Sequence, residues 1–148
     1  MKNTEMLITR PKDAELGQGN CGVVAIAAAT GVSYSEVWHY IDNVFNKRSN
    51  WKGGLSLMQI HQTLMHFNKR VGYTPPRKCD EILSRMTLLS FCKDIPENLQ
   101  HKVMVVITTG HAQVVRGRQV LDQSCEIAVD VSEYHLRRKQ VRAIFTIN

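Results

Sequence analysis

The chain has 148 residues, of which 43% are hydrophobic and 22% are charged, and this size and balance predict one globular domain covering residues 1–148. The sequence starts without an apolar export signal and contains no apolar run as long as a membrane span. We therefore expect a cytoplasmic protein with reduced thiols and no membrane partner. Its four cysteines form no CxxC pair and no HxxxH pair occurs, so we expect neither a metal nor a cofactor.

The formal net charge of +6 raises the question of a nucleic-acid partner. The basic residues are scattered, except for Arg137-Arg138-Lys139 with Arg142 near the end of the chain. No basic strand interleaved with aromatic residues accompanies this cluster, so a solvated helix face is the favoured interpretation. Nucleic acid is therefore a secondary candidate partner, and an acidic partner stays open.

Three helices are predicted in the first half of the chain. The first covers about residues 20–30, is apolar on every face and stops at Gly31, so it should run through the core. The second covers about residues 34–46 and starts with a Ser-x-x-Glu capping box. The third covers about residues 55–68, where apolar residues recur at helical spacing.

The second half of the chain is predicted to consist mainly of strands. A short helix is expected over residues 80–86, and residues 87–93 fit a helix and a strand equally well. The expected strands cover residues 71–74, 102–107, 111–115, 119–122 and 141–147. The predicted fold class is α+β, with N-terminal helices packed on an antiparallel sheet.

Cys21 lies on the first turn of the apolar helix, directly after a Gly/Asn turn. The positive end of a helix favours a thiolate, and a buried helix gives a nucleophile a rigid support. An oxyanion hole would combine the Cys21 N–H with a side-chain donor, for which Gln18 and Asn20 are both candidates. The alternative interpretation is a structural cysteine that acts as a small hydrophobe.

A predicted hairpin brings a histidine and a carboxylate together. A two-residue loop at Arg116-Gly117 pairs Val115 with Arg118 and places His111 opposite Asp122, whereas a three-residue loop shifts the register by one. Taken singly, the two residues also fit a hydrogen-bonded strand histidine and a turn carboxylate. Together with the thiol at the helix tip, they supply the nucleophile, the base and the orienting group that thiol catalysis needs.

Two stretches carry a resemblance to a known family. Gln18–Ala25, followed by Ala29–Val37, resembles the start of papain-like cysteine peptidases. Within that superfamily it is most similar to the small branch related to the leader-cleaving peptidase domains of bacterial peptide exporters, which includes stand-alone proteins of phages and bacteria. Gly110–Val115, Gly117 and Val120–Asp122 resemble the histidine-to-aspartate hairpin of that group.

The resemblance implies a papain-like fold led by the Cys21 helix, in the bacterial cytoplasm or in the host cytoplasm for a phage protein. It implies that Cys21 is the nucleophile, His111 the general base and acid, and Asp122 the orienting residue. Gln18 would be the oxyanion donor, although the family's glutamine usually lies five or six residues before the cysteine and Gln18 lies three before it. Asn20 is therefore a rival for this role.

Further residues are assigned to substrate binding by the same resemblance. Gly53-Gly54 would match the glycine pair that binds the substrate backbone in papain relatives, with Trp51 as a wall of the cleft. A plain flexible loop is the alternative. The Gly-Asn-Cys turn also resembles ovarian-tumour-type deubiquitinases, in which an aspartate takes the place of Gln18, and this family ranks second.

The expected function is hydrolysis of a peptide or isopeptide bond in a peptide or protein substrate, through an acyl-enzyme on Cys21. Acyl transfer and deamidation use the same acyl-enzyme, so the sequence does not separate them from hydrolysis. A third hypothesis is a catalytically idle scaffold that neutralises a host factor or binds nucleic acid through the basic cluster.

Overall fold

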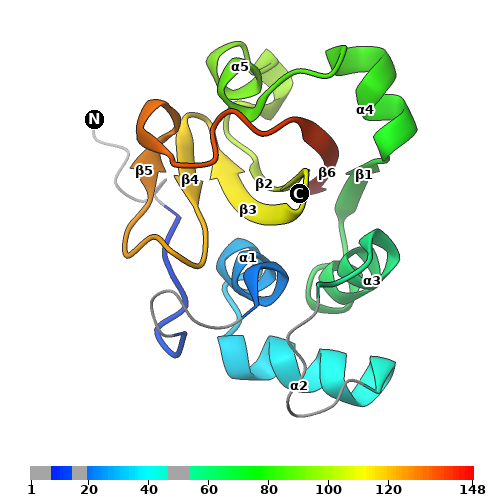
Figure 1. Cartoon of the computed structure of the whole chain (residues 1–148). Helices are drawn as coiled ribbons and strands as arrows, with labels where there is room; N and C mark the ends of the chain where they lie inside the picture. The colour runs from blue at the N-terminus through cyan, green and yellow to red at the C-terminus, as the bar shows by residue number, and fades with distance from the viewer. Residues whose placement is uncertain (1–7, 15–19, 47–53) are drawn as a thin grey trace.

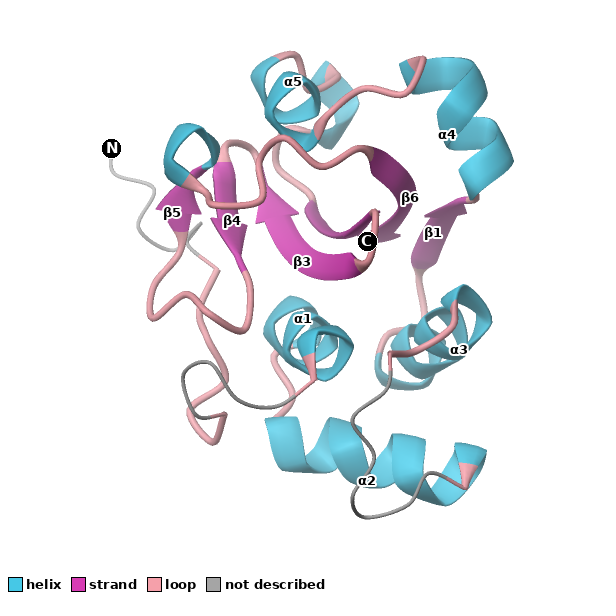
Figure 2. Cartoon of the chain, in the orientation of Figure 1, coloured by secondary structure: helices cyan, strands magenta, loops and turns pink. Residues whose placement is uncertain are grey.

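The computed structural model describes residues 8–14, 20–46 and 54–148, and within these ranges it has five α-helices and a sheet of six antiparallel strands (Figures 1 and 2). The predicted α+β class is therefore confirmed. No single helix in the described ranges is long and apolar enough to cross a membrane. The helices Cys21–Thr30 and Tyr34–Phe45, which meet at a bend of 120°, reach that length and apolar composition only when taken together.

The three N-terminal helices lie close to their predicted positions. They are α1 (Cys21–Thr30), α2 (Tyr34–Phe45) and α3 (Leu57–Phe67). Helix α1 stops at Gly31, whose φ of 78° is in the left-handed region that favours glycine. The Ser33 hydroxyl accepts a hydrogen bond from the Glu36 N–H and caps α2, as the capping-box pattern predicts.

Two further helices differ from the sequence prediction. Helix α4 (Pro76–Leu83) starts four residues before the predicted helix, because proline at the first helical position loses no intrahelical hydrogen bond. It stops at Ser84, which has a φ of 49°. The undecided segment 87–93 forms helix α5 (Leu88–Lys93), which Thr87 caps by accepting a hydrogen bond from a backbone N–H. Two short 3₁₀-helices complete the helical elements, η2 (Glu97–Leu99) and η3 (Val131–Glu133).

The strands form one sheet in the order β1-β6-β2-β3-β4-β5, with every neighbouring pair antiparallel. The last strand of the chain therefore lies in the interior of the sheet, between the first strand and β2. The strands are β1 (Val71–Thr74), β2 (Val103–Thr108), β3 (His111–Arg116), β4 (Gln119–Leu121), β5 (Val129–Asp130) and β6 (Val141–Ile147).

Helices cover both faces of the sheet. Figure 1 shows α1, α2 and α3 on one side and α4 and α5 on the other. A hydrophobic core lies on each face of the sheet, and successive residues of β2 point into one or the other. Met104 and Val106 pack with α4 and α5, whereas Val105 packs with the N-terminal helices. Helix α1 lies against β2 and β3 with Gly22–Ala27 buried, as its all-round apolar sequence predicts.

Two local predictions are wrong. The β3–β4 loop is Gly117-Arg118 instead of Arg116-Gly117, because Val115 pairs with Val120. Gly117, with a φ of 60°, takes the first central position of the turn, where a residue of positive φ is required. The basic cluster is also not a helix face, since Arg137–Lys139 lie in turns between η3 and β6.

Candidate active site

Cys21 is the first residue of α1 and therefore lies at the N-terminus of that helix. The Asn20 side-chain oxygen accepts a 2.9 Å hydrogen bond from the Gly22 N–H and caps the helix. A Cβ atom at Gly22 would lie 3.0 Å from the Leu55 Cδ1 atom, so glycine allows the segment before α3 to approach the thiol closely. Cys21 itself is partly exposed, whereas the six residues that follow it are buried.

A tight turn at the start of β3 places His111 beside the thiol. Thr108 pairs with His111 across a two-residue turn that ends in Gly110, whose φ is 74°. The His111 side chain is 15% exposed, and its Nε2 donates a 2.8 Å hydrogen bond to the Oδ2 atom of the fully buried Asp122. The structure therefore brings together the histidine and the carboxylate that the sequence predicts as neighbours.

The two residues meet along a diagonal of the sheet. Leu121 pairs with Val114, so Asp122 comes next to Gln113 across the strands and one diagonal step from His111. Diagonal Cα atoms lie about 7–8 Å apart, which an aromatic side chain can span. The predicted contact is present although the predicted register is wrong.

Asp122 is held by donors on both of its oxygens. Oδ1 accepts from the Ser124 N–H at 2.9 Å, from the Ser124 hydroxyl at 2.7 Å and from the Cys125 thiol at 3.2 Å. Oδ2 accepts from His111 and from the Tyr134 hydroxyl, the latter at 2.7 Å. Burial alone would raise the pKa of this carboxyl, but these hydrogen bonds outweigh burial and hold the pKa well below its ordinary value.

The contact between Cys21 and His111 lowers the pKa of the thiol and raises the pKa of the imidazole. Burial raises the pKa of Cys21, but the hydrogen bond to His111, the charge of that ring and the N–H groups of Ala112 and Gly22 outweigh it and lower the pKa below 9.0. Burial lowers the pKa of His111, but the hydrogen bonds to Asp122 and Cys21 raise it to about 9. Because Nε2 faces Asp122, Nδ1 is the ring nitrogen left for the thiol. These are the shifts of a thiolate–imidazolium pair.

The other three cysteines behave as structural thiols. Burial raises the pKa of Cys79 to about 11 and that of Cys92 to about 12, and it also raises the pKa of Cys125. All four cysteines lie in the described ranges and are free thiols. Cys21 is thus the one cysteine of the chain whose pKa is lowered.

An apolar cavity of about 200 Å³ opens beside the thiol and the imidazole. Aliphatic side chains from α3 and β2 line it, together with three glycines. The lining residues other than Cys21 and His111 include Gly54, Leu55, Ile60, Ile107, Gly110 and Ala112. The predicted substrate-binding residue Gly54 therefore lies next to the thiol.

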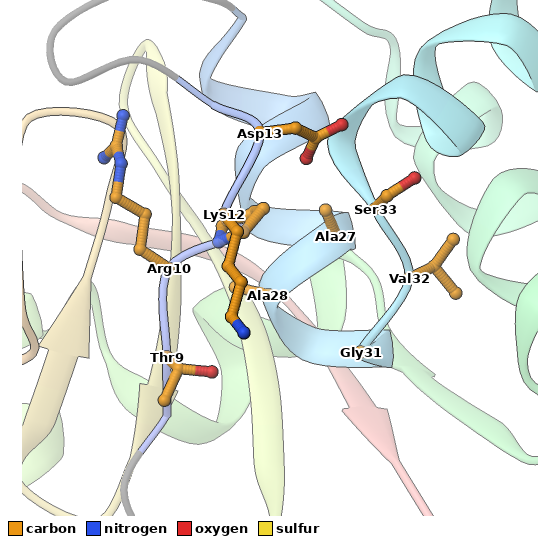
Figure 3. A pocket seen from close by; sticks show the side chains of 10 residues that line it. Thr9, Arg10, Lys12, Asp13, Ala27, Ala28, Gly31, Val32 and Ser33 are labelled. Carbon is orange, nitrogen blue, oxygen red and sulfur yellow. The ribbon is translucent and has the colours of Figure 1, made fainter.

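A larger hollow of about 520 Å³ lies at the other end of α1 (Figure 3). It is formed by residues 9–13 and by the junction between α1 and α2. Its one carboxylate, Asp13, accepts hydrogen bonds from the backbone N–H groups of Tyr34 and Ser35 and so caps α2. Its lining contains no thiol or imidazole, so its size alone does not make it the reactive site.

For some of the predicted site residues, the predicted role stays a prediction. Gln18, Trp51 and Gly53 lie outside the described residues. Asn20 caps α1, because its side-chain oxygen accepts a hydrogen bond from the Gly22 N–H. As an oxyanion donor it would use the NH₂ group of the same side chain. Among the described residues, no group of three or more His, Cys, Asp or Glu side chains could hold a metal ion.

Sequence reasoning missed four residues around Asp122, one of which is Cys125, whose thiol donates to Oδ1. Gln113 is a polar residue in an otherwise apolar strand, two positions from His111 and therefore on the same face, and this pattern could have revealed it. Ser124 and Tyr134 occur in polar segments without periodicity, and no sequence signal marks them.

Comparisons of the chain with protein-family models, with curated proteins and with solved structures find no match. The functional argument therefore depends on the geometry and chemistry of the site.

Proposed function

We propose that this chain is a papain-like cysteine hydrolase that cleaves a peptide or isopeptide bond through an acyl-enzyme on Cys21. The observation that carries the proposal is the continuous contact from the Cys21 thiol through His111 to the buried Asp122. A nucleophile, a base and an orienting group in this order are the requirements of covalent acyl transfer. We also propose that the protein works in the reducing cytoplasm, where thiols stay reduced.

The reaction would proceed in two halves. The Cys21 thiolate attacks the substrate carbonyl carbon, a C–S bond forms, and the His111 imidazolium gives its proton to the leaving nitrogen as the C–N bond breaks. Water then loses a proton to His111 and attacks the thioester, which releases a carboxylate and restores the thiolate–imidazolium pair. Asp122 fixes the ring tautomer in both halves. The oxyanion would be stabilised by the Cys21 N–H, with Gln18 or Asn20 as the side-chain donor.

The cavity beside Cys21 supports a peptide or protein as the proposed substrate. Its volume of about 200 Å³ is below the range of about 300–1,000 Å³ that is usual for small-molecule sites, so it fits one side chain of a longer substrate. The side chains of Leu55, Ile60 and Ile107 favour an aliphatic group there. A peptide or protein substrate satisfies both conditions.

The test is a digest of a proteome-derived peptide mixture, with products identified by mass spectrometry. Cys21→Ala is the inactive variant, and Cys79→Ala, which removes a buried thiol on α4, is the matched control. We expect new cleavage products with the native chain and with Cys79→Ala, and none with Cys21→Ala. Identical patterns for the native chain and Cys21→Ala would contradict the proposal and favour the idle scaffold.

The same digest separates hydrolysis from the other acyl-enzyme reactions. In water enriched in heavy oxygen, hydrolysis puts the label on new C-termini. Transfer to an added amine gives an amide instead, and deamidation labels glutamine or asparagine side chains without cutting the chain. Labelled new C-termini are the result expected for a peptidase.

A further inference from the structure

One oxygen of Asp122 serves two donors that come from distant parts of the chain. Its Oδ2 atom accepts from His111 at 2.8 Å and from the Tyr134 hydroxyl at 2.7 Å. Tyr134 directly follows η3 and is 1% exposed. The other oxygen, Oδ1, has three donors of its own from Ser124 and Cys125. The tyrosine therefore shares with the histidine the oxygen that orients the imidazole.

The Tyr134 hydroxyl lies between two acceptors but has a single hydrogen. The Asp122 carboxylate oxygen is 2.7 Å away and the Gln113 side-chain oxygen is 2.9 Å away. The carboxylate is the stronger acceptor because it carries a charge. The Gln113 oxygen is also within 3.4 Å of the Thr108 hydroxyl, and its amide nitrogen donates to the Val106 carbonyl. Tyr134 is thus directed to Asp122.

Burial makes this contact hard to replace. Gln113, Thr108 and Asp122 are at most 1% exposed, so bulk water does not reach the hydroxyl position. A buried carboxylate that loses a hydrogen-bond donor stays without it, because water does not reach the carboxylate to take the donor's place. A further group near Oδ2 is His135, whose side chain is about half exposed and whose Nε2 lies 3.7 Å away.

We propose that Tyr134 is a positioning residue, whose hydroxyl shares the Asp122 oxygen that binds His111 and so limits how strongly that oxygen holds the imidazolium. The inference rests on the role of His111 as acid and base in the proposed function. Without the hydroxyl, Oδ2 accepts a stronger hydrogen bond from the His111 imidazolium. The pKa of His111 then rises, and the ring becomes a weaker acid toward the leaving nitrogen. Tyr134 keeps the proton on His111 transferable.

The titratable groups around this pair come from several elements. Cys21 on α1 contacts His111, Cys125 after β4 contacts Asp122, and His135 next to Tyr134 faces Asp122. Burial raises the pKa of Tyr134 well above its ordinary range, so the hydroxyl stays a neutral donor throughout the titration of His111. A change at Tyr134 therefore acts through its hydrogen bond.

The experiment is a nuclear magnetic resonance titration of the His111 ring in the full chain, with the signal assigned through His111→Gln. Tyr134→Phe removes one donor from Oδ2, and Ser124→Ala, the matched variant, removes one donor from Oδ1. We expect Tyr134→Phe to raise the His111 midpoint by about 0.5 to 1 pH unit, and Ser124→Ala to raise it by less than half as much. An unchanged or lowered midpoint in Tyr134→Phe, or equal shifts in the two variants, would overturn the inference.

A second measurement covers the case in which Tyr134→Phe does not fold. Tyrosine fluorinated next to its hydroxyl is a stronger hydrogen-bond donor, and it can replace the four tyrosines of the chain during expression. We expect this substitution to lower the His111 midpoint, opposite to Tyr134→Phe; no change or a rise would refute the inference. The titration needs no substrate, so failure of the peptidase proposal would appear as an unreactive Cys21 and would leave this test intact.

Discussion

Replacing His111 by alanine removes both the hydrogen bond and the positive charge that lower the pKa of Cys21. The burial that raises this pKa remains, with only the N–H groups of Ala112 and Gly22 to oppose it. An opposite charge at contact distance shifts a pKa by about 1–3 units, so the thiol pKa should rise by about that much in His111→Ala. At a pH below both values, the thiolate fraction then falls by about 10-fold to 1,000-fold.

The loss of reactivity is smaller than the loss of thiolate. A more basic thiolate is a better nucleophile, with a Brønsted coefficient of about 0.4–0.5. This gain cancels nearly half of the loss on a logarithmic scale, so alkylation of Cys21 should slow by roughly 3-fold to 60-fold. The reasoning treats His111 as the main group that lowers this pKa, which the contacts of the thiol support.

The assay measures the rate of iodoacetamide alkylation against pH, followed by peptide mapping. Cys79, Cys92 and Cys125 are internal standards, because their pKa values are raised. His101→Ala, which removes an exposed histidine just before β2, is the matched control and should leave the Cys21 profile unchanged. The reasoning is refuted if all four cysteines react at equal rates, or if His111→Ala leaves the Cys21 profile where it is.

Three further predictions follow from the same contacts. Asp122→Asn removes the charge that supports the imidazolium, so the pKa of His111 should fall from about 9 toward its ordinary 6.5, as a magnetic resonance titration would show. Asn20→Ala removes the cap of α1 and should lower the free energy of unfolding in urea by about 0.5–2 kcal/mol. In Cys21→Ala, the folded-state pKa of His111 still exceeds its unfolded value because Asp122 remains. Because the Cys21 contacts that help to raise it are gone, this pKa lies below the native value of about 9. The stability that His111 supplies is complete below about pH 6.5 and is lost as the pH rises through that lowered pKa, whereas in the native chain the loss extends toward pH 9 and the early proton loss of Cys21 flattens it. Urea midpoints across this pH range would check this difference.

The N-terminal helices could be predicted closely because their signals are local. Helix α1 runs from Cys21 to Thr30, against an expected range of 20–30, since an apolar run and a glycine stop define it without reference to the rest of the chain. Helix α5 has only six residues, too few for a periodic pattern, so the sequence does not decide between a helix and a strand, and the Thr87 cap identifies the helix only in the structure. A helix can therefore be predicted when its own residues carry an apolar run and a stop signal. A helix of one or two turns is too short to show the periodic pattern on which such a prediction depends.

Tyr134 marks the limit of prediction for the site. It lies 12 positions after Asp122, beyond β5 and η3, and its hydroxyl reaches the carboxylate because β5 pairs antiparallel with β4 and so brings the chain back. A tyrosine in a polar segment gives no sequence signal for such a contact. The partners of a buried carboxylate depend on tertiary packing, so sequence spacing revealed His111 but not Tyr134.

The His111–Asp122 contact survives a wrong register because side chains alternate along a strand with a period of two. Moving the loop from Arg116-Gly117 to Gly117-Arg118 shifts each pairing by two residues, so Asp122 stays on the face that carries His111 and Gln113. A three-residue loop would have shifted the pairing by one and turned Asp122 to the opposite face. The two-residue length of the loop, and not its exact position, is therefore what places the histidine and the carboxylate on one face.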